Sequence, residues 1–186
     1  TPNDRYFYGG GIRQMTFVFT NTPTSLTQLG PIARFEHCAN CEIENVFSYG
    51  AYNGFVAFAG FRNHYSNVYL NQMVTSKTVN QGHGFEIYGD ETGPSCASSV
   101  GNCETRMDVT YIKDFHIDFN FNETEGILPS TGIWIHDFAQ TVWLDHGTMG
   151  QPHIGINITC ENSSQLGTCP GFISIMRVEA EVNAMS

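Results

Sequence analysis

Carboxylate side chains lie beside short apolar strands at two places in this sequence. Glu86 lies at the centre of one such strand, and Asp90 follows a few residues later. Asp137 comes directly after His136 at the end of another. Two carboxyl groups held about 5 to 9.5 Å apart are what hydrolysis of a glycosidic bond requires. Glu86, Asp137 and Asp90 are therefore the candidate catalytic acids, and Glu86 is the first choice because a strand fixes its position.

Two histidines lie close to these acids in the sequence. His83 stands between two glycines shortly before Glu86, and His136 precedes Asp137. An imidazole near a carboxyl group shifts its pKa, and acid–base catalysis depends on such shifts. His83 is therefore a fourth catalytic candidate. The alternative is that His83 is an ordinary turn residue and that Glu86 and Asp137 are solvated side chains on a strand face.

The strands that would position these residues form a repeat. Glycine followed by an apolar–x–apolar triplet recurs along the chain, at Gly54, Gly84, Gly132 and Gly155. A second short apolar alternation follows most of these, and no helical period is sustained. Repeats of this size predict a solenoid, because each unit has too little apolar surface for a core and must stack on its neighbours. A β-sandwich and an antiparallel barrel are the competing folds, but only one Asn-Gly dipeptide of the hairpin type occurs.

Stacked units would place residues from different repeats side by side. Alternate residues of a strand point to opposite sides, so one set faces inward and the other outward. The expected inward ladders contain Phe85, Ile87, Ile133, Ile135, Ile156 and Ile158. The expected outward columns are Val56, Glu86, Trp134 and Asn157, then Phe58, Tyr88, His136 and Thr159. Because neighbouring strands lie about 4.8 Å apart, two outward acids one or two coils apart meet the spacing that glycoside hydrolysis needs.

The whole chain, residues 1–186, is predicted to be one domain. The long interval between Gly84 and Gly132 is predicted to hold an inserted loop around 89–106 and an extra turn through Ile117 and Phe119. The chain starts without methionine and ends after a strand-like stretch, so we expect a fragment of a longer solenoid.

Outward aromatic residues accompany the candidate acids. Trp134, Tyr88 and Phe58 fall in the outward columns of neighbouring repeats. Such rings can stack on sugar rings, whose C–H faces are apolar. With His136 and Arg62 they are the candidate substrate-binding residues. The alternative is that this apolar stripe packs under a loop or against a neighbouring chain.

The composition narrows the class of protein. Hydrophobic residues make up 41% of the 186 residues and charged residues only 14%, which suits an all-β domain with many turns. The formal net charge is −10, and no basic stripe is present for binding nucleic acid or a membrane surface. No apolar run reaches the length of about 18 residues that a membrane span needs. The same charge would repel a polyanion, so a neutral or mixed polysaccharide is the favoured partner.

The six cysteines fall into three local pairs, namely Cys38 with Cys41, Cys96 with Cys103, and Cys160 with Cys169. Three short disulfide loops are the first interpretation, with free thiols and a metal site as alternatives. Three Asn-x-Ser/Thr sequons, at Asn122, Asn157 and Asn162, also favour a secreted, extracellular or virion-surface protein. We expect no cofactor and no metal, since neither a phosphate loop nor a calcium-type acidic triad is evident.

Two stretches resemble a known group of proteins. The segment FEHCANCEIENVFSYGAYNGFVAF at 35–58 reads like one coil of the pectate-lyase-like superfamily, and GGGIRQMTFVFTNT at 9–22 is similar to its entry coil. That superfamily contains pectate lyases, polygalacturonase-type hydrolases, glucanases and viral tailspike depolymerases. The resemblance implies a right-handed, single-stranded parallel β-helix, a polysaccharide partner and, in some members, assembly into homotrimers.

The segment Gly82-His83-Gly84 is similar to a motif that polygalacturonase-type hydrolases carry beside their catalytic aspartates. The preceding repeat lacks the paired acids of that family, and no Arg-x-Lys signature occurs in the chain. The resemblance therefore implies a fold more strongly than a mechanism. Two functions stay open: a glycoside hydrolase or lyase acting along one strand face, and a non-catalytic glycan-binding or structural module of the tailspike type.

Overall fold

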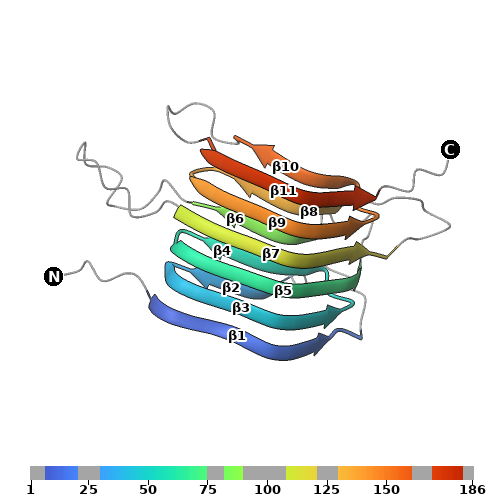
Figure 1. The fold of residues 1–186 in the computed structure, drawn as a ribbon. Helices are drawn as coiled ribbons and strands as arrows, with labels where there is room; N and C mark the ends of the chain where they lie inside the picture. Colours follow the sequence, from blue (N-terminus) through green and yellow to red (C-terminus); the bar gives the residue numbers. More distant parts are fainter. Residues whose placement is uncertain are drawn as a thin grey trace, which may run out of the picture.

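The computed structural model describes residues 7–20, 30–74, 82–89, 108–120, 130–160 and 169–181. All regular structure in these residues is β-strand, arranged in two parallel sheets (Figure 1). The six-stranded sheet has the order β1 (Phe7–Val18), β3 (Cys38–Tyr49), β5 (Phe61–Met73), β7 (Asp108–Phe119), β9 (Thr141–Gly150) and β11 (Phe172–Glu181). The five-stranded sheet has the order β10 (Ile154–Thr159), β8 (Ser130–His136), β6 (Gly82–Tyr88), β4 (Asn53–Phe58) and β2 (Pro31–Glu36). The prediction of an all-β protein is confirmed.

The chain alternates between the two sheets. Each strand pairs in parallel with the strand that comes two positions later in the chain order. The prediction of an extra turn between Gly84 and Gly132 is wrong. Strand β6 pairs directly with β8, so no extra turn separates them, and Ile117 and Phe119 lie in β7 of the other sheet. The inserted loop expected at 89–106 falls outside the described residues, apart from Gly89.

The register confirms the predicted ladders of the five-stranded sheet, although Ile158, on the edge strand β10, is 46% exposed rather than buried. Phe55 aligns with Phe85, Phe85 with Ile133, and Ile133 with Ile156. The outward columns also form as expected, since Glu86 aligns with Val56 on one side and with Trp134 on the other. The period-two alternation of each strand therefore fixes which side chains become neighbours.

The core lies between the inward faces of the two sheets. Phe85, Ile87, Ile133 and Ile135 from the five-stranded sheet are at most 1% exposed. The facing row of the six-stranded sheet is equally buried and contains Ile43, Tyr65, Ile112 and Leu144. Removing a side chain of this size from water contributes roughly 1.5–3 kcal/mol, so the ladders are the main source of stability.

The repeated glycines occupy one column because no side chain fits there. A Cβ atom built on Gly84 would lie 2.6 Å from the carbonyl oxygen of Gly132 and 2.7 Å from Cδ1 of Ile117. The first of these atoms belongs to the backbone of the next strand and cannot move aside. Gly54, Gly84 and Gly132 thus mark positions where a Cβ atom would overlap the backbone of the next strand in the same sheet.

A second column bends every strand of the six-stranded sheet. Its members adopt positive φ between 50° and 58°: Gln14, Asn45, Asn67, Asp114, His146 and Arg177. Asn67 Nδ2 donates a hydrogen bond to Asn45 Oδ1 at 2.7 Å, which links two neighbouring bends. Asn and Asp tolerate this left-handed conformation better than other side chains. The strands of this sheet consequently curve in mid-length (Figure 1).

Two of the predicted disulfides are present, Cys38–Cys41 and Cys160–Cys169. Cys96 and Cys103 lie outside the described residues, and none of the described cysteines is free. Within the described part of the chain, no helix has the length and apolar character to cross a membrane.

Candidate functional site on the outward face of the five-stranded sheet

Most of the predicted site residues gather on the outward face of the five-stranded sheet. His83, Glu86 and Tyr88 lie on β6, Trp134 and His136 on β8, and Phe58 on β4, while Asp137 directly follows β8. Arg62 does not join them, because it lies on β5 of the six-stranded sheet. Asp90 is outside the described residues.

The two predicted acids are connected through one histidine. His136 Nε2 lies 3.2 Å from Glu86 Oε1, and His136 Nδ1 lies 3.1 Å from Asp137 Oδ2. The side chain of His136 is only 7% exposed, that of Asp137 11% and that of Glu86 21%. Asp137 and His136 are therefore buried groups rather than solvated ones, and Glu86 is the member that solvent reaches most easily.

The charges of this network favour a protonated histidine. Burial by itself lowers the pKa of His136, but the hydrogen bonds and charges of Glu86 and Asp137 outweigh it and raise the pKa above 6.5. A protonated imidazole donates from both ring nitrogens, one to each carboxylate. In this state the network holds a cationic ring between the carboxyl groups of Glu86 and Asp137.

Aromatic rings hold His136 from both sides. The Tyr88 ring stacks on it at 4.5 Å with an interplanar angle of 13°, and the Trp134 ring lies 4.0 Å away at 26°. The row continues from Tyr88 to Phe58 at 4.8 Å, and the Arg34 guanidinium lies 4.9 Å from the Phe58 ring centroid. These contacts fix the imidazole plane, and with it the direction of both hydrogen bonds.

Trp134 also connects two further strands. Its indole Nε1 donates a hydrogen bond to Thr159 Oγ1 on β10 at 2.8 Å. Its ring contacts the His83 ring on β6 at 4.8 Å. The predicted outward column therefore works as a packed row in which one indole spans three neighbouring strands.

His83 has a different environment from His136. Its Nδ1 atom is buried and has no hydrogen-bond partner among the described residues. Burial lowers the pKa of His83; the nearby His136 acts in the same direction and Glu86 opposes it. The backbone N–H of His83 donates to Asn53 Oδ1 at 3.1 Å, which fixes the chain at the Gly-His-Gly segment. His83 is thus a neutral, ring-packed histidine near neutral pH.

This geometry restricts the chemistry that the acids could do. The imidazole of His136 stands between the two carboxyl groups, where a glycosidase pair would hold the scissile bond. The rings of Tyr88 and Trp134 turn their faces toward neighbouring rings, so they present mainly their edges outward. The face therefore offers fixed hydrogen-bonding groups and ring edges. In the described residues, no group of three or more His, Cys, Asp or Glu side chains is arranged to hold a metal ion.

Sequence reasoning placed Glu86, His136 and Asp137 near one another but did not predict that they form one hydrogen-bonded network. The strand register was the sequence signal that could have revealed this network. It places Glu86 beside Trp134, and His136 follows two residues later on the strand of Trp134. A mixed-charge groove on the six-stranded sheet was also not singled out, although its residues alternate in the same way along β3, β5 and β7.

In comparisons with known proteins, no family model, no curated protein and no solved structure matches this chain. The resemblance to the pectate-lyase-like superfamily therefore depends on the repeat pattern of the sequence alone.

Proposed function

We propose that this chain is a right-handed parallel β-helix that binds a neutral or mixed polysaccharide on the outward face of its five-stranded sheet. The alternation of the chain between two parallel sheets supports the β-helix, because successive strands then lie on successive coils. The two disulfides and the three sequons support an extracellular or virion-surface location.

The Glu86–His136–Asp137 network is the observation that carries this proposal. A carboxylate held in place by a buried imidazolium accepts hydrogen bonds from sugar hydroxyls without losing side-chain entropy on binding. Tyr88 and Trp134 add apolar ring edges beside it. The chain carries a formal net charge of −10, so an uncharged glycan suits this face better than a polyanion.

Cleavage of the bound glycan is a second candidate function, and the position of Glu86 favours it. Its carboxylate is 21% exposed and lies on a rigid strand, so it could act as a general base toward water. Binding is preferred because His136 occupies the space between Glu86 and Asp137, and no second carboxyl group among the described residues faces Glu86 across an open gap.

Affinity electrophoresis on a panel of neutral polysaccharides, combined with a reducing-end assay, tests both candidates. Wild type should be retained by at least one glycan without releasing reducing ends. Glu86→Gln should weaken retention, while Glu179→Gln, which removes an equal charge from an exposed site on β11, should not. Equal retention of both variants would contradict binding at this face. Release of reducing ends that Glu86→Gln abolishes would replace the binding function with the hydrolytic one.

A further inference from the structure

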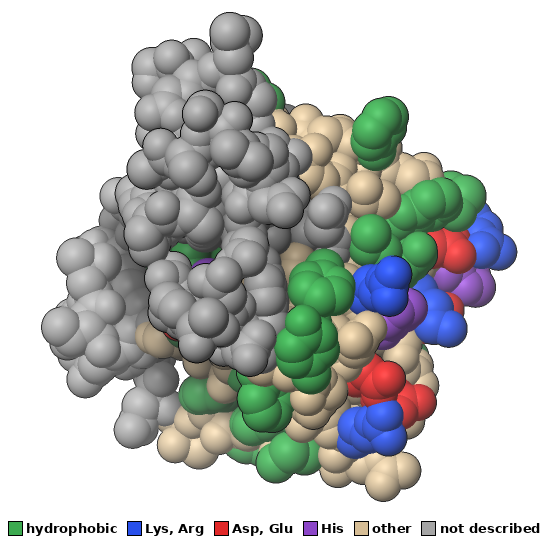
Figure 2. All heavy atoms as spheres, turned by 90° about the vertical axis from the view of Figure 1, so that its left-hand side faces the viewer, with side chains coloured by type: hydrophobic (Ala, Val, Ile, Leu, Met, Phe, Trp, Pro, Cys, Tyr) green, Lys and Arg blue, Asp and Glu red, His purple; other side chains and the backbone are tan. Residues whose placement is uncertain are grey.

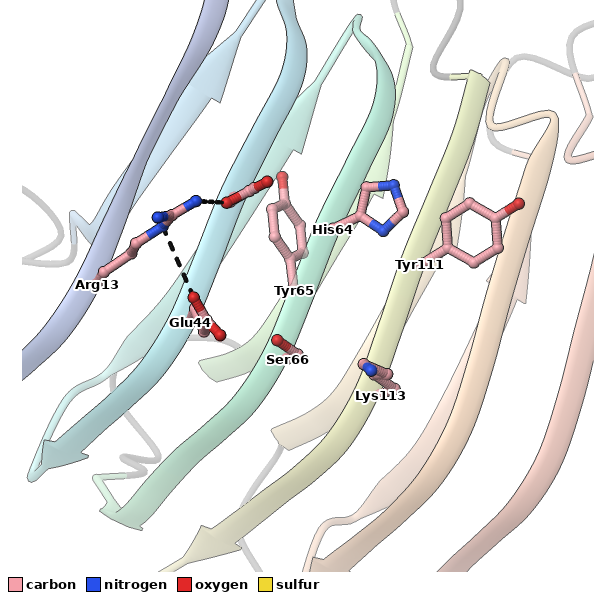
Figure 3. A pocket seen from close by; sticks show the side chains of 8 residues that line it. Arg13, Glu44, His64, Tyr65, Ser66, Tyr111 and Lys113 are labelled. Carbon is pink, nitrogen blue, oxygen red and sulfur yellow. Dashed lines mark hydrogen bonds and ion pairs between the residues drawn. The ribbon is translucent and has the colours of Figure 1, made fainter.

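A shallow groove of about 610 Å³ lies on the outward face of the six-stranded sheet, on a different sheet from the Glu86–His136–Asp137 network. It crosses four neighbouring strands, β1, β3, β5 and β7 (Figure 3). Its lining contains Arg13, Glu42, Glu44, His64, Tyr65, Ser66, Tyr111 and Lys113. In the space-filling view, charged and histidine side chains gather along one edge of the molecule, with hydrophobic side chains beside them (Figure 2).

The strand register arranges the groove in two outward rows. The first row aligns Glu42 with His64 and His64 with Tyr111. The second aligns Glu44 with Ser66 and Ser66 with Lys113. The two ends of the second row therefore lie two strand spacings apart, which is roughly 10 Å. Figure 3 shows Glu44, Ser66 and Lys113 on three successive strands in this order.

The β3 end of the groove has a surplus carboxylate. Arg13 makes an ion pair with Glu42 and lies 3.7 Å from Glu44. The hydrogen bond and charge of Glu42, with a contribution from Glu44, raise the pKa of Arg13. One guanidinium thus faces two carboxylates, and one negative charge stays uncompensated at this end.

The β7 end of the groove has a surplus positive charge. Asp145 is the register neighbour of Lys113, but Arg177 engages it through Nε at 3.0 Å and Nη2 at 2.6 Å. Lys113 therefore has no ion pair within the described part of the chain. The Ser66 hydroxyl lies between the two ends, and beside it the His64 ring on β5 stacks on the Tyr111 ring on β7 at 4.8 Å.

We propose that this groove binds a zwitterionic glycan segment, with an amino sugar at the Glu44 end and a carboxylate-bearing sugar at Lys113. The ligand's ammonium compensates the surplus carboxylate, its carboxylate pairs with Lys113, and a hydroxyl group between them reaches Ser66. A ligand of this kind is neutral overall, so the charge of −10 does not repel it. The choice of a glycan rests on the function proposed above, whereas the charge pattern belongs to a groove on the other sheet.

Titration calorimetry with three short oligosaccharides of equal length tests the ligand class. One carries a free amine and a carboxylate about 10 Å apart, the second is its N-acetylated form, and the third is its carboxyl-reduced form. The zwitterionic form should bind roughly three- to fivefold more tightly than either blocked form, since an exposed ion pair is worth up to about 1 kcal/mol, which is about fivefold. The difference should shrink in high salt. Equal binding of all three would overturn the proposal.

Variants locate the site on the protein. Glu44→Lys and Lys113→Glu should each lose the preference for the zwitterionic form, and the double charge swap should restore it with the ligand reversed. Glu179→Gln, which removes a charge from an exposed site on β11 outside the groove, serves as the control and should leave this preference unchanged. None of these substitutions touches the five-stranded face, so failure here is separable from failure of the function proposed above. Triglycine, a zwitterion without sugar rings, should bind more weakly than the oligosaccharide. Unchanged preference in both single variants, or equal binding of triglycine, would refute the assignment.

Discussion

His136→Phe is the most informative single change in this protein. Phenylalanine keeps a ring between Tyr88 and Trp134, so the stacking contacts at 4.5 and 4.0 Å survive in outline. It removes both ring nitrogens, and with them the hydrogen bonds to Glu86 and Asp137. The variant therefore separates the polar network from the packing that surrounds it.

The expected decrease in the free energy of unfolding of His136→Phe follows from the burial of Glu86 and Asp137. A hydrogen bond to a charged group contributes roughly 1.5–3 kcal/mol, and two are lost. Asp137 is 11% exposed and Glu86 21% exposed, so water compensates more of the lost hydrogen bond at Glu86 than at Asp137. We expect His136→Phe to lower the free energy of unfolding by about 3 kcal/mol near pH 6.

The pH dependence of the free energy of unfolding provides a second test of the protonation of His136. Burial opposes protonation of His136, but its two carboxylate partners raise its pKa above that of the unfolded chain. Protonated His136 consequently adds stability that is fully present below about pH 6.5 and is lost as pH rises through the folded-state pKa. The stability difference between wild type and His136→Phe should therefore narrow from pH 6 toward pH 9.

Urea denaturation at several pH values measures both effects. His146→Asn is the control, because His146 Nδ1 also lies 3.2 Å from a carboxylate, Asp114 Oδ1, and asparagine tolerates the left-handed φ of 58° at this position. That pair is on the surface, with side chains 65% and 46% exposed, so its removal should cost about 0.5 kcal/mol or less. A cost below about 1 kcal/mol for His136→Phe, or the same cost at pH 6 and pH 9, would refute the proposed charge state of the network.

Three further predictions concern the fold that positions this site, and all are measured by chemical denaturation. Gly84→Ala should destabilise the protein by about 1–3 kcal/mol, because its Cβ would overlap backbone of the next strand, whereas Gly30→Ala meets nothing within 4 Å and should be neutral. Asn67→Ala should cost about 1–2 kcal/mol through its left-handed φ of 57° and its lost side-chain hydrogen bond, and Asn67→Gly should cost less. Phe85→Ala, in a side chain 1% exposed, should cost about 3–5 kcal/mol, whereas Phe172→Ala, 84% exposed, should cost little; equal costs would contradict the assigned core.

Much of the strand register could be predicted because it depends on local alternation. In a parallel sheet the side-chain period is two, so aligning the repeated glycines also aligns Phe85 with Ile133 and Glu86 with Trp134. The same reasoning brought Tyr88, His136 and Phe58 to one face. It placed two disulfides correctly, because each joins cysteines close in the chain.

The errors came from the intervals between repeats. The span between Gly84 and Gly132 contains one ordinary strand, β7, and residues that the structure does not describe, so its length alone wrongly predicted an extra turn. Arg62 was expected near the substrate face, but it follows the corner between β4 and β5 and lies on the other sheet. A corner between two strands decides on which sheet the following residues lie. The alternation of apolar residues does not show where these corners are.

The sequence by itself determined the all-β class, the inward ladders and the membership of the outward columns, because these follow from a two-residue period and from the positions where only glycine fits. The tertiary structure decided the charge state and contacts of the candidate site. Whether His136 bridges Glu86 and Asp137, and whether Lys113 finds a partner, depends on burial and on distances of a few ångströms between side chains of neighbouring strands. Those distances depend on how the whole stack of strands packs, and no single repeat contains that information.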